Sequence, residues 1–525
     1  MTHLLHFVQV FLQALLDTDF CTVNLLLYSL TLNIWEKWKN NPVIVSFAEK
    51  STPVWQIPFP AVTVCPETKA RQTVFNFTKV YADMTNKAIN YTLSDEESSY
   101  LEAIFQICQS HMIQNTGFGS NISSASELVE IFEIIQPPFL ESYFNCRWRN
   151  KKRNCESSFH KFLTEEGICY TFNSPDQTNI FREESHIPEF VFNTENISES
   201  TWTLEKGYTN FDFTNEQFPI RVMAAGSRGG LFLELKGKKI DYDMMCRGPV
   251  PGFKILLHTP GEIPQVSRQY LRVPYDQEVL IAIKPKIITT SNGLMGYEPA
   301  RRQCFFQNEK YLRFFKLYTQ NNCEVECIAN YTLTRCGCVK FSMPRNETTP
   351  VCGAAKITCY NQAEDELLQE EFIEGLQTSK LNYRGETKCN CLPSCTEIVY
   401  DAEISQAEYD FHAQMRALGL HDYNGNGQIS SVFQRESFLT SRRSELYGTT
   451  DFLANVGGLL GLFMGVSMIS FVELVYFCTV RLISNLRMRR RNLVELKSLE
   501  SAKQELDKED LTARKRSFRN KYFFN

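Results

Sequence analysis

A long apolar run near the C-terminus is the strongest hydrophobic pattern in the chain. Residues 452–480 form 29 consecutive positions at which Glu473 is the only charged side chain. About 20 apolar residues are enough to span a bilayer, so the run predicts a transmembrane helix over residues 451–482. Five arginines follow at once: Arg481, Arg487, Arg489, Arg490 and Arg491. Basic residues flank membrane spans on the cytoplasmic side, so residues 483–525 are expected to be a cytoplasmic tail.

The apolar pattern at the N-terminus is weaker. Residues 4–16 and 20–35 are apolar, with Asp17 and Asp19 between them. This predicts a first transmembrane helix over residues 19–37, after a short cytoplasmic segment of residues 1–18. No basic residue precedes it, so charge gives no support for a cytoplasmic N-terminus. A cleaved signal peptide over the first 16 residues, or an incomplete N-terminus, are the alternatives.

Between the two apolar runs, short strand-like and helix-like patterns alternate. Period-two alternation predicts strands at residues 43–47, 55–59, 230–235 and 253–258. Helical spacing predicts helices at residues 125–135, 309–318 and 362–377. No internal repeat is visible, so we expect residues 38–450 to form an α+β domain.

The cysteines place this middle region in an oxidising compartment. Of 18 cysteines, 16 lie between Cys65 and Cys395. Zinc is the alternative, because Cys336-Gly-Cys338 and Cys389-Asn-Cys391 look like ligand pairs, but their one-residue spacing is tighter than usual. Disulfides are therefore favoured over metal.

Glycosylation sequons share the limits of the cysteines. The six sequons begin at Asn76, Asn90, Asn121, Asn196, Asn330 and Asn346. One such motif arises often by chance, but six in the same stretch indicate that the middle region is extracellular.

Composition and motif searches exclude several classes of function. The chain has 55 basic and 60 acidic residues, which argues against a nucleic-acid partner. It has no nucleotide-binding loop, no nucleophile elbow and no His-Glu-x-x-His helix. We therefore expect neither an enzyme nor a bound cofactor or metal.

Several motifs occur in the order found in one channel family. They are Phe59-Pro-Ala-Val-Thr-Val-Cys-Pro66, Cys323-Glu-Val-Glu-Cys327, Cys336-Gly-Cys338, Cys389-Asn-Cys-Leu-Pro-Ser-Cys395 and Gly457-Gly-Leu-Leu-Gly461. Over residues 38–485 the chain resembles the degenerin/epithelial sodium channel family, most of all its insect pickpocket branch. The resemblance implies an acid-sensing-ion-channel-like fold: two transmembrane helices flanking a large disulfide-rich α+β extracellular domain, with a cysteine-rich thumb at about residues 300–396.

The family's disulfide pattern can be carried onto this chain. The resemblance implies the pairs Cys65–Cys169, Cys146–Cys155, Cys304–Cys395, Cys323–Cys391, Cys327–Cys389, Cys336–Cys359 and Cys338–Cys352. Cys108 and Cys246 remain and are paired by elimination. Sequence spacing alone could not choose this connectivity.

Gly465, Val466 and Ser467 match the family's selectivity filter. The resemblance implies a break in the helix there, so that backbone carbonyls replace part of the water shell of a sodium ion. Valine at the middle position departs from the usual alanine or serine.

Other residues of the same run resemble the family's gate and pore. Ala454 occupies the degenerin position at the outer mouth, Asn455 replaces a common aspartate, and Gly458 and Gly461 belong to the pore helix. The glycines also fit close helix packing. Glu473 is assigned to a carboxylate ring that attracts cations, with a structural hydrogen bond as the alternative.

The resemblance implies a plasma-membrane channel subunit with both termini cytoplasmic. The channel would be a homo- or hetero-trimer, conduct sodium ions, be blocked by amiloride and be voltage-independent, and an extracellular chemical or mechanical stimulus would open it. The family's cytoplasmic His-Gly motif is absent, so the subunit either has an incomplete N-terminus or depends on partners. A cell-surface receptor or adhesion protein on a single anchor, without conduction, is the rival hypothesis.

Overall fold

The computed structural model describes residues 18–40, 43–48, 50–86, 92–108, 118–185, 202–208, 218–226, 229–381, 389–410, 413, 416–417, 426–433, 437–446, 448–465 and 468–521. The chain divides into two compact units. Residues 43–445 form the larger unit, and residues 1–42 with 446–525 form the helical unit. The predicted segment of residues 1–18 lies almost wholly outside the described residues.

An eight-stranded sheet organises the larger unit. Its strand order is β1-β17-β12-β15-β9-β5-β6, with β14 also paired to β12. The strands are β1 (Val43–Phe47), β5 (Tyr143–Trp148), β6 (Lys151–Arg153), β9 (Leu231–Lys236), β12 (Gln277–Thr290), β14 (Glu397–Glu408), β15 (Asn426–Phe433) and β17 (Ser441–Glu445). Val279, Ile281 and Ile283 of β12 are fully buried while their neighbours are more exposed. This alternation places one face of the strand on the hydrophobic core.

A second sheet of five strands packs on the same core. Its order is β11-β10-β3-β8-β7. The strands are β3 (Ala61–Pro66), β7 (Phe159–Thr164), β8 (Gly167–Phe172), β10 (Gly252–His258) and β11 (Leu271–Pro274). All six residues of β3 are buried, because β3 is central and both of its faces are covered. One hydrophobic cluster joins side chains of both sheets, including Val64, Ile255 and Ile281.

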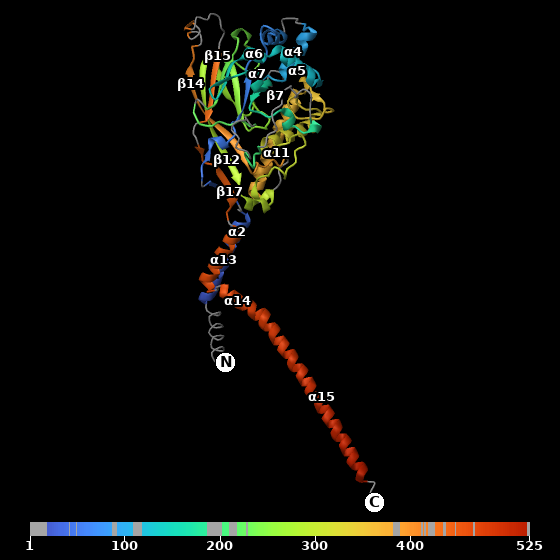
Figure 1. Ribbon diagram of the computed structural model, residues 1–525. Coiled ribbons are helices and arrows are strands. Elements are labelled where there is room, and N and C mark those ends of the chain that lie inside the picture. The colour runs from blue at the N-terminus through green and yellow to red at the C-terminus, as the bar shows by residue number, and fades with distance from the viewer. Residues whose placement is uncertain are drawn as a thin grey trace. The chain divides into compact units, whose positions relative to one another are not determined.

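Helices carry a second hydrophobic cluster. Figure 1 shows α4 (Asp95–Phe105), α5 (Ala125–Ile135) and α11 (Ile357–Leu381) on the side of the strands away from β14 and β15. Helix α4 begins at a capping box, in which Ser94 Oγ accepts from the Glu97 N–H and Glu97 accepts from the Ser94 N–H. Shorter elements complete the unit: α3 (Phe77–Thr85), α6 (Phe139–Ser142), α7 (Cys155–Ser158), α8 (Gln177–Ile180), α9 (Pro299–Arg302), β2 (Thr52–Pro53), β4 (Ile122–Ser123), β13 (Val351–Cys352) and β16 (Ser437–Phe438).

Disulfides cross-link the larger unit. The eight bridges are Cys65–Cys169, Cys108–Cys246, Cys146–Cys155, Cys304–Cys395, Cys323–Cys391, Cys327–Cys389, Cys336–Cys359 and Cys338–Cys352. These are the eight pairs expected above. Helix α10 (Gln320–Cys336) packs against α11 and supplies Cys323, Cys327 and Cys336 to three of the bridges. One bridge, Cys336–Cys359, joins α10 to α11, and the other two join α10 to Cys389 and Cys391 in the segment after α11.

Most predicted elements of the larger unit are present, and two are wrong. Residues 309–318 are not helical, because their backbone bonds to another segment: the Arg182 N–H donates to Phe314 O and the Lys316 N–H donates to Ile180 O. Residues 55–59 are not a strand either, since Val54–Gln56 form a 3-10 helix. The helices predicted at residues 125–135 and 362–377 lie in α5 and α11, and the strands predicted at residues 43–47, 230–235 and 253–258 correspond to β1, β9 and β10.

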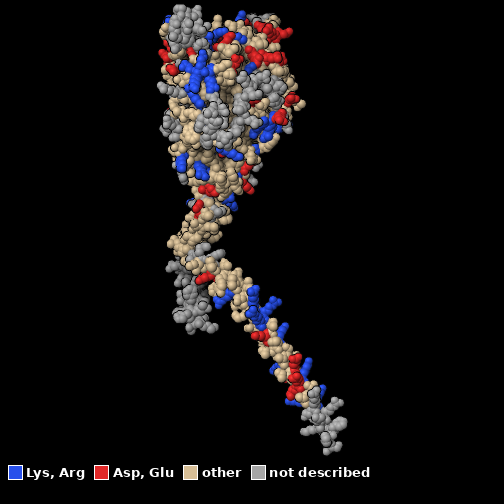
Figure 2. Space-filling view, viewed as in Figure 1, with Lys and Arg blue, Asp and Glu red and all other residues tan. Residues whose placement is uncertain are grey.

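The helical unit contains α2 (Thr18–Asn40), α13 (Thr449–Met464), α14 (Met468–Tyr476), a π-helical turn (Phe477–Arg481) and α15 (Leu482–Lys521). Figure 2 shows both signs of charge along α15. Within the described ranges, no helix combines the length and the apolar character needed to cross a membrane. Residues 451–482, predicted to be a transmembrane helix with a break at the filter, fall in α13, α14, the π-helical turn and the first residue of α15, with residues 466 and 467 outside the described residues.

Candidate pore site

Helix α13 carries most of the predicted pore residues, and local contacts fix where it begins. The Gly448 N–H donates to Asp451 Oδ2 at 3.1 Å, which satisfies one of the backbone donors left free at a helix N-terminus. The mean hydropathy of the helix is high, and Asp451 is its only charged residue. The helix therefore has 16 residues and is apolar after a polar first turn.

Gly465 ends α13 in the left-handed conformation, with φ 64° and ψ 16°. Its N–H donates to Gly461 O at 3.0 Å, which closes the last turn of the helix. A residue with a side chain would be strained at this φ, so glycine suits the position. Val466 and Ser467 lie outside the described residues, and α14 begins at Met468. A helix boundary therefore stands at the first residue of the predicted filter.

The two sides of α13 differ in side-chain size. Its partly buried residues recur at spacings of three and four and so share one face: Phe452, Val456, Leu459 and Phe463. Helix α13 contacts α2, and Phe452 of this face lies against Trp35 and Trp38 of that helix. On the opposite side lie Ala454, Gly458 and Gly461, which are exposed. Apart from chain neighbours and the backbone of α13 itself, no described atom lies within 4 Å of where a Cβ would stand at Gly457 or Gly458.

The two remaining pore candidates are exposed in the single chain. Asn455 follows Ala454 on α13, and Glu473 lies in the middle of α14. No salt bridge involves Glu473 within the described part of the chain.

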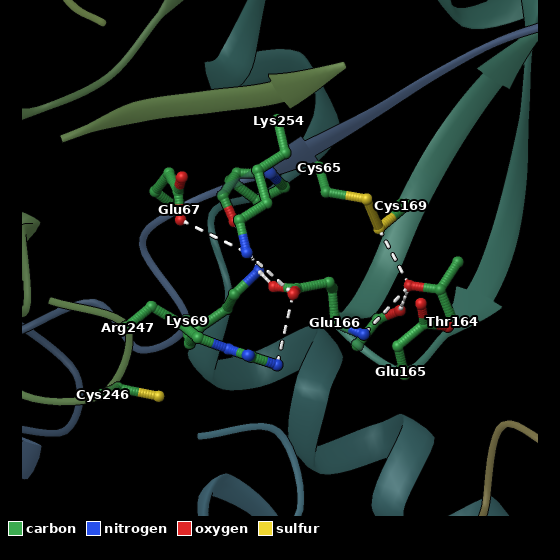
Figure 3. A network of polar contacts seen from close by, with 12 residues as sticks. Cys65, Glu67, Lys69, Thr164, Glu165, Glu166, Cys169, Cys246, Arg247 and Lys254 are labelled. Carbon is green, nitrogen blue, oxygen red and sulfur yellow. Dashed lines mark hydrogen bonds and ion pairs between the residues drawn. A yellow bond between two sulfur atoms is a disulfide. The ribbon is translucent and has the colours of Figure 1, made fainter. Parts of the chain in front are cut away.

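A network of buried charges in the larger unit was not anticipated (Figure 3). Glu166, in the turn between β7 and β8, is 1% exposed and faces three cations. Its Oε2 lies 2.6 Å from Lys69 Nζ, and its Oε1 lies 2.8 Å from Lys254 Nζ and 3.2 Å from an Arg247 nitrogen. Glu67 joins the network, 3.8 Å from Lys254 Nζ.

Burial and charge pull the pKa values in this network in opposite directions. Burial lowers the pKa of Lys69 to about 8, although the Glu166 carboxylate opposes the shift. Burial favours the neutral form of Glu166, but the cations around it hold its pKa well below the usual range. The disulfides Cys65–Cys169 and Cys108–Cys246 begin or end within three residues of network members. In sequence these charges resemble solvent-exposed residues, so no pattern signals them.

A cavity of about 270 Å³ lies beside the start of α10 in the larger unit. Glu262, Glu397 and Tyr400 line part of it. Burial raises the pKa of Glu262 to about 7, while hydrogen bonds to Thr319 and Thr259 oppose the shift. Among the described residues, no group of three or more His, Cys, Asp or Glu is placed to hold a metal ion.

The sequons differ in exposure. Asn121 and Asn330 are exposed, whereas Asn346 is partly buried. Asn76 is partly buried and caps α3, with its Oδ1 accepting from the Lys79 N–H at 3.0 Å. Asn90 and Asn196 lie outside the described residues. Glycosylation at all six remains a prediction.

Comparison with known proteins decides the family. A family model described as amiloride-sensitive sodium channel matches residues 20–477, well over half of the chain. The chain belongs to this family. Membership implies a membrane protein with a large extracellular domain, in a family of ion channels rather than of enzymes.

Individual members of this family are similar to the protein along most of its length. Pickpocket protein 28 of Drosophila melanogaster is 27% identical over 86% of this chain and 71% of its own length. The sodium channel protein Nach of Drosophila melanogaster is 23% identical over 86% of this chain and 79% of its own. The bile acid-sensitive ion channel of Mus musculus is 22% identical over the same shares, 86% and 79%.

Proposed function

We propose that this protein is a pore-forming subunit of a trimeric, voltage-independent sodium channel that amiloride blocks. The protein would lie in the plasma membrane and cross it twice, once with α2 and once with α13 and α14. These crossings would flank the extracellular larger unit, and both termini would be cytoplasmic. An extracellular chemical or mechanical stimulus would open the pore.

The end of α13 at Gly465 is the observation that carries this proposal. The last turn of a helix leaves backbone carbonyls without partners inside the helix, and the negative end of the helix dipole lies there. Carbonyl oxygens are the groups that replace the water of a permeating cation. Gly465, Val466 and Ser467 are therefore proposed as the filter, with carbonyl oxygens rather than side chains as ligands.

The open side of α13 supports the same proposal. Ala454, Gly458 and Gly461 are small and exposed, while the bulky side of the helix contacts α2 through an aromatic ring. Small residues let helices approach closely, so three copies of this side can surround a narrow axis. Glu473 would add a carboxylate per subunit, which attracts cations because water lines such a position.

The proposal is tested by whole-cell recording with external sodium and amiloride, comparing the unaltered chain with Ala454→Val. A larger side chain at the outer mouth hinders closure, so we expect the basal amiloride-sensitive current to rise at least fivefold. Leu453→Val is the matched control, since Leu453 is the adjacent residue and its side chain is 68% exposed. Surface-expressed protein that passes no sodium current in either form would favour the single-anchor receptor instead.

A further inference from the structure

Three aromatic rings join α2 to the first turn of α13. Trp35 and Trp38 are three residues apart on α2 and so lie on one side of that helix. The Phe452 ring centroid lies 5.2 Å from that of Trp38 and 5.9 Å from that of Trp35. The two tryptophan rings are 5.3 Å apart. All three separations fall in the range at which aromatic pairs attract.

Beyond this aromatic cluster, the two helices continue to match. Along α2, the partly or fully buried positions follow spacings of three and four residues and are Asn24, Leu27, Leu30, Thr31, Ile34 and Trp38. The half-buried face of α13 described above has the same spacing. Repeats of this kind let two helices stay in contact over several turns. The Thr31 hydroxyl does not interrupt the packing, because it donates to Leu27 O at 2.8 Å within its own helix.

The cluster is close to the outer-mouth residue. Phe452 is two positions before Ala454 on α13, and its ring is held on the side of the helix opposite to that of Ala454. A ring fixed on one side of a helical turn also fixes the direction in which the other side points. Thirteen residues after Phe452, Gly465 ends the helix.

We propose that Trp35, Trp38 and Phe452 form an aromatic clamp that positions Ala454 at the outer mouth. The clamp makes α2 and α13 of one subunit move as a single body, with the helix boundary at Gly465 as the point below which α14 can turn separately. This inference rests on the proposed channel function, because the outer mouth exists only if α13 lines a pore. The three residues are positioning residues and touch no ion.

The test uses the full chain with Ala454→Cys, in which Cys21→Ser and Cys478→Ser remove the two cysteines of the apolar runs. A cationic methanethiosulfonate is applied to intact cells, and its rate of reaction with the introduced thiol is read from the loss of later biotin–maleimide labelling. This readout needs no current. We expect Phe452→Leu and Trp38→Leu each to raise the rate at least fivefold, because the freed turn samples more exposed orientations.

Two comparisons separate a clamp from a general loss of packing. Phe452→Tyr keeps a ring and should leave the rate within twofold, and so should Leu453→Ala, which removes an exposed side chain from the same turn. The double variant of Trp38 and Phe452 should match the single variants, since breaking the contact once is enough.

Each outcome bears on one claim. Rates within twofold in both Phe452→Leu and Trp38→Leu overturn the clamp, and so does an equal rise in Leu453→Ala. The two leucine variants alter different helices, so misfolding of one leaves the other as the test. If the rates rise but no variant passes sodium current, the contact stands and the proposed channel function fails.

Discussion

Glycine and glutamate have closely packed surroundings in the larger unit and open surroundings on α13 and α14. In the larger unit, a Cβ at Gly252 would stand 2.1 Å from Val273 O, and Glu166 is closed in by three cations. In the helical unit, no described atom beyond its chain neighbours and the backbone of its own helix lies within 4 Å of the Cβ position at Gly458, and Glu473 is exposed. The larger unit surrounds Gly252 and Glu166 with atoms of its own chain. Helices α13 and α14 leave Gly458 and Glu473 exposed.

We expect the largest effect on stability from the loss of a buried carboxylate in the larger unit. Glu166→Gln leaves Lys69 and Lys254 buried without their shared counter-charge, which should lower the free energy of unfolding by about 3–5 kcal/mol. Chemical denaturation of the purified protein measures it. Glu141→Gln is the control, because Glu141 pairs with Lys238 at the surface, where both side chains are more than 40% exposed. We expect that control to cost at most about 0.5 kcal/mol. Equal unfolding midpoints for the two variants would contradict the contrast.

The second prediction compares two glycine-to-alanine changes. Gly252 has φ 146° and a backbone oxygen in the way, so Gly252→Ala should destabilise the larger unit by about 2–5 kcal/mol. A Cβ at Gly458 meets no described atom beyond its chain neighbours and the backbone of its own helix, so Gly458→Ala should not destabilise the fold. It should instead lower sodium current about tenfold by separating neighbouring copies of α13. A destabilised fold in Gly458→Ala, with Gly252→Ala unaffected, would reverse the comparison.

A third, smaller effect concerns how much the disulfides that close long loops contribute to the stability of the larger unit. Cys108–Cys246 joins residues separated by 138 positions, whereas Cys146–Cys155 spans only 9. Replacing both cysteines of the long loop by serine should cost about 2 kcal/mol more than replacing both of the short one, on the chain-entropy account. Urea unfolding without reductant checks this. The chain-entropy account would be contradicted if loss of the Cys146–Cys155 bridge lowered the free energy of unfolding more than loss of Cys108–Cys246.

The smallest effect is a pH dependence in the larger unit. The pKa of Glu262 is about 7 in the folded protein against 4.5 as the ordinary value. Between these values the folded state binds a proton that the unfolded state does not, so stability rises as pH falls through 7 and levels off below 4.5. From pH 7.5 to 5 the unfolding temperature should gain about 1–3 °C from this group. Glu262→Gln should remove that gain, and an undiminished gain would assign it to other groups.

Sequence patterns predicted the features that depend on local composition. The helix at α5 follows from hydrophobic periodicity, because it buries one side of its own segment. The apolar run of residues 452–480 and the strand at β10 follow from continuous apolar character instead, and β10 is buried on both sides. The disulfide pairs came from the family resemblance and not from spacing. The helix expected at residues 309–318 failed because its backbone is bonded to residues 180–182, which periodicity cannot detect.

The candidate pore segment could be proposed from the sequence, because its apolar residues and its glycines lie in one continuous run. Only the tertiary structure showed that Phe452 meets Trp35 and Trp38, and that Lys69, Glu166 and Lys254 meet in the interior. Such contacts join residues about a hundred or more positions apart, and a charged or aromatic side chain looks the same in sequence whether it is exposed or buried. The chain's composition therefore decides which segments are apolar, whereas folding decides which distant side chains share one site.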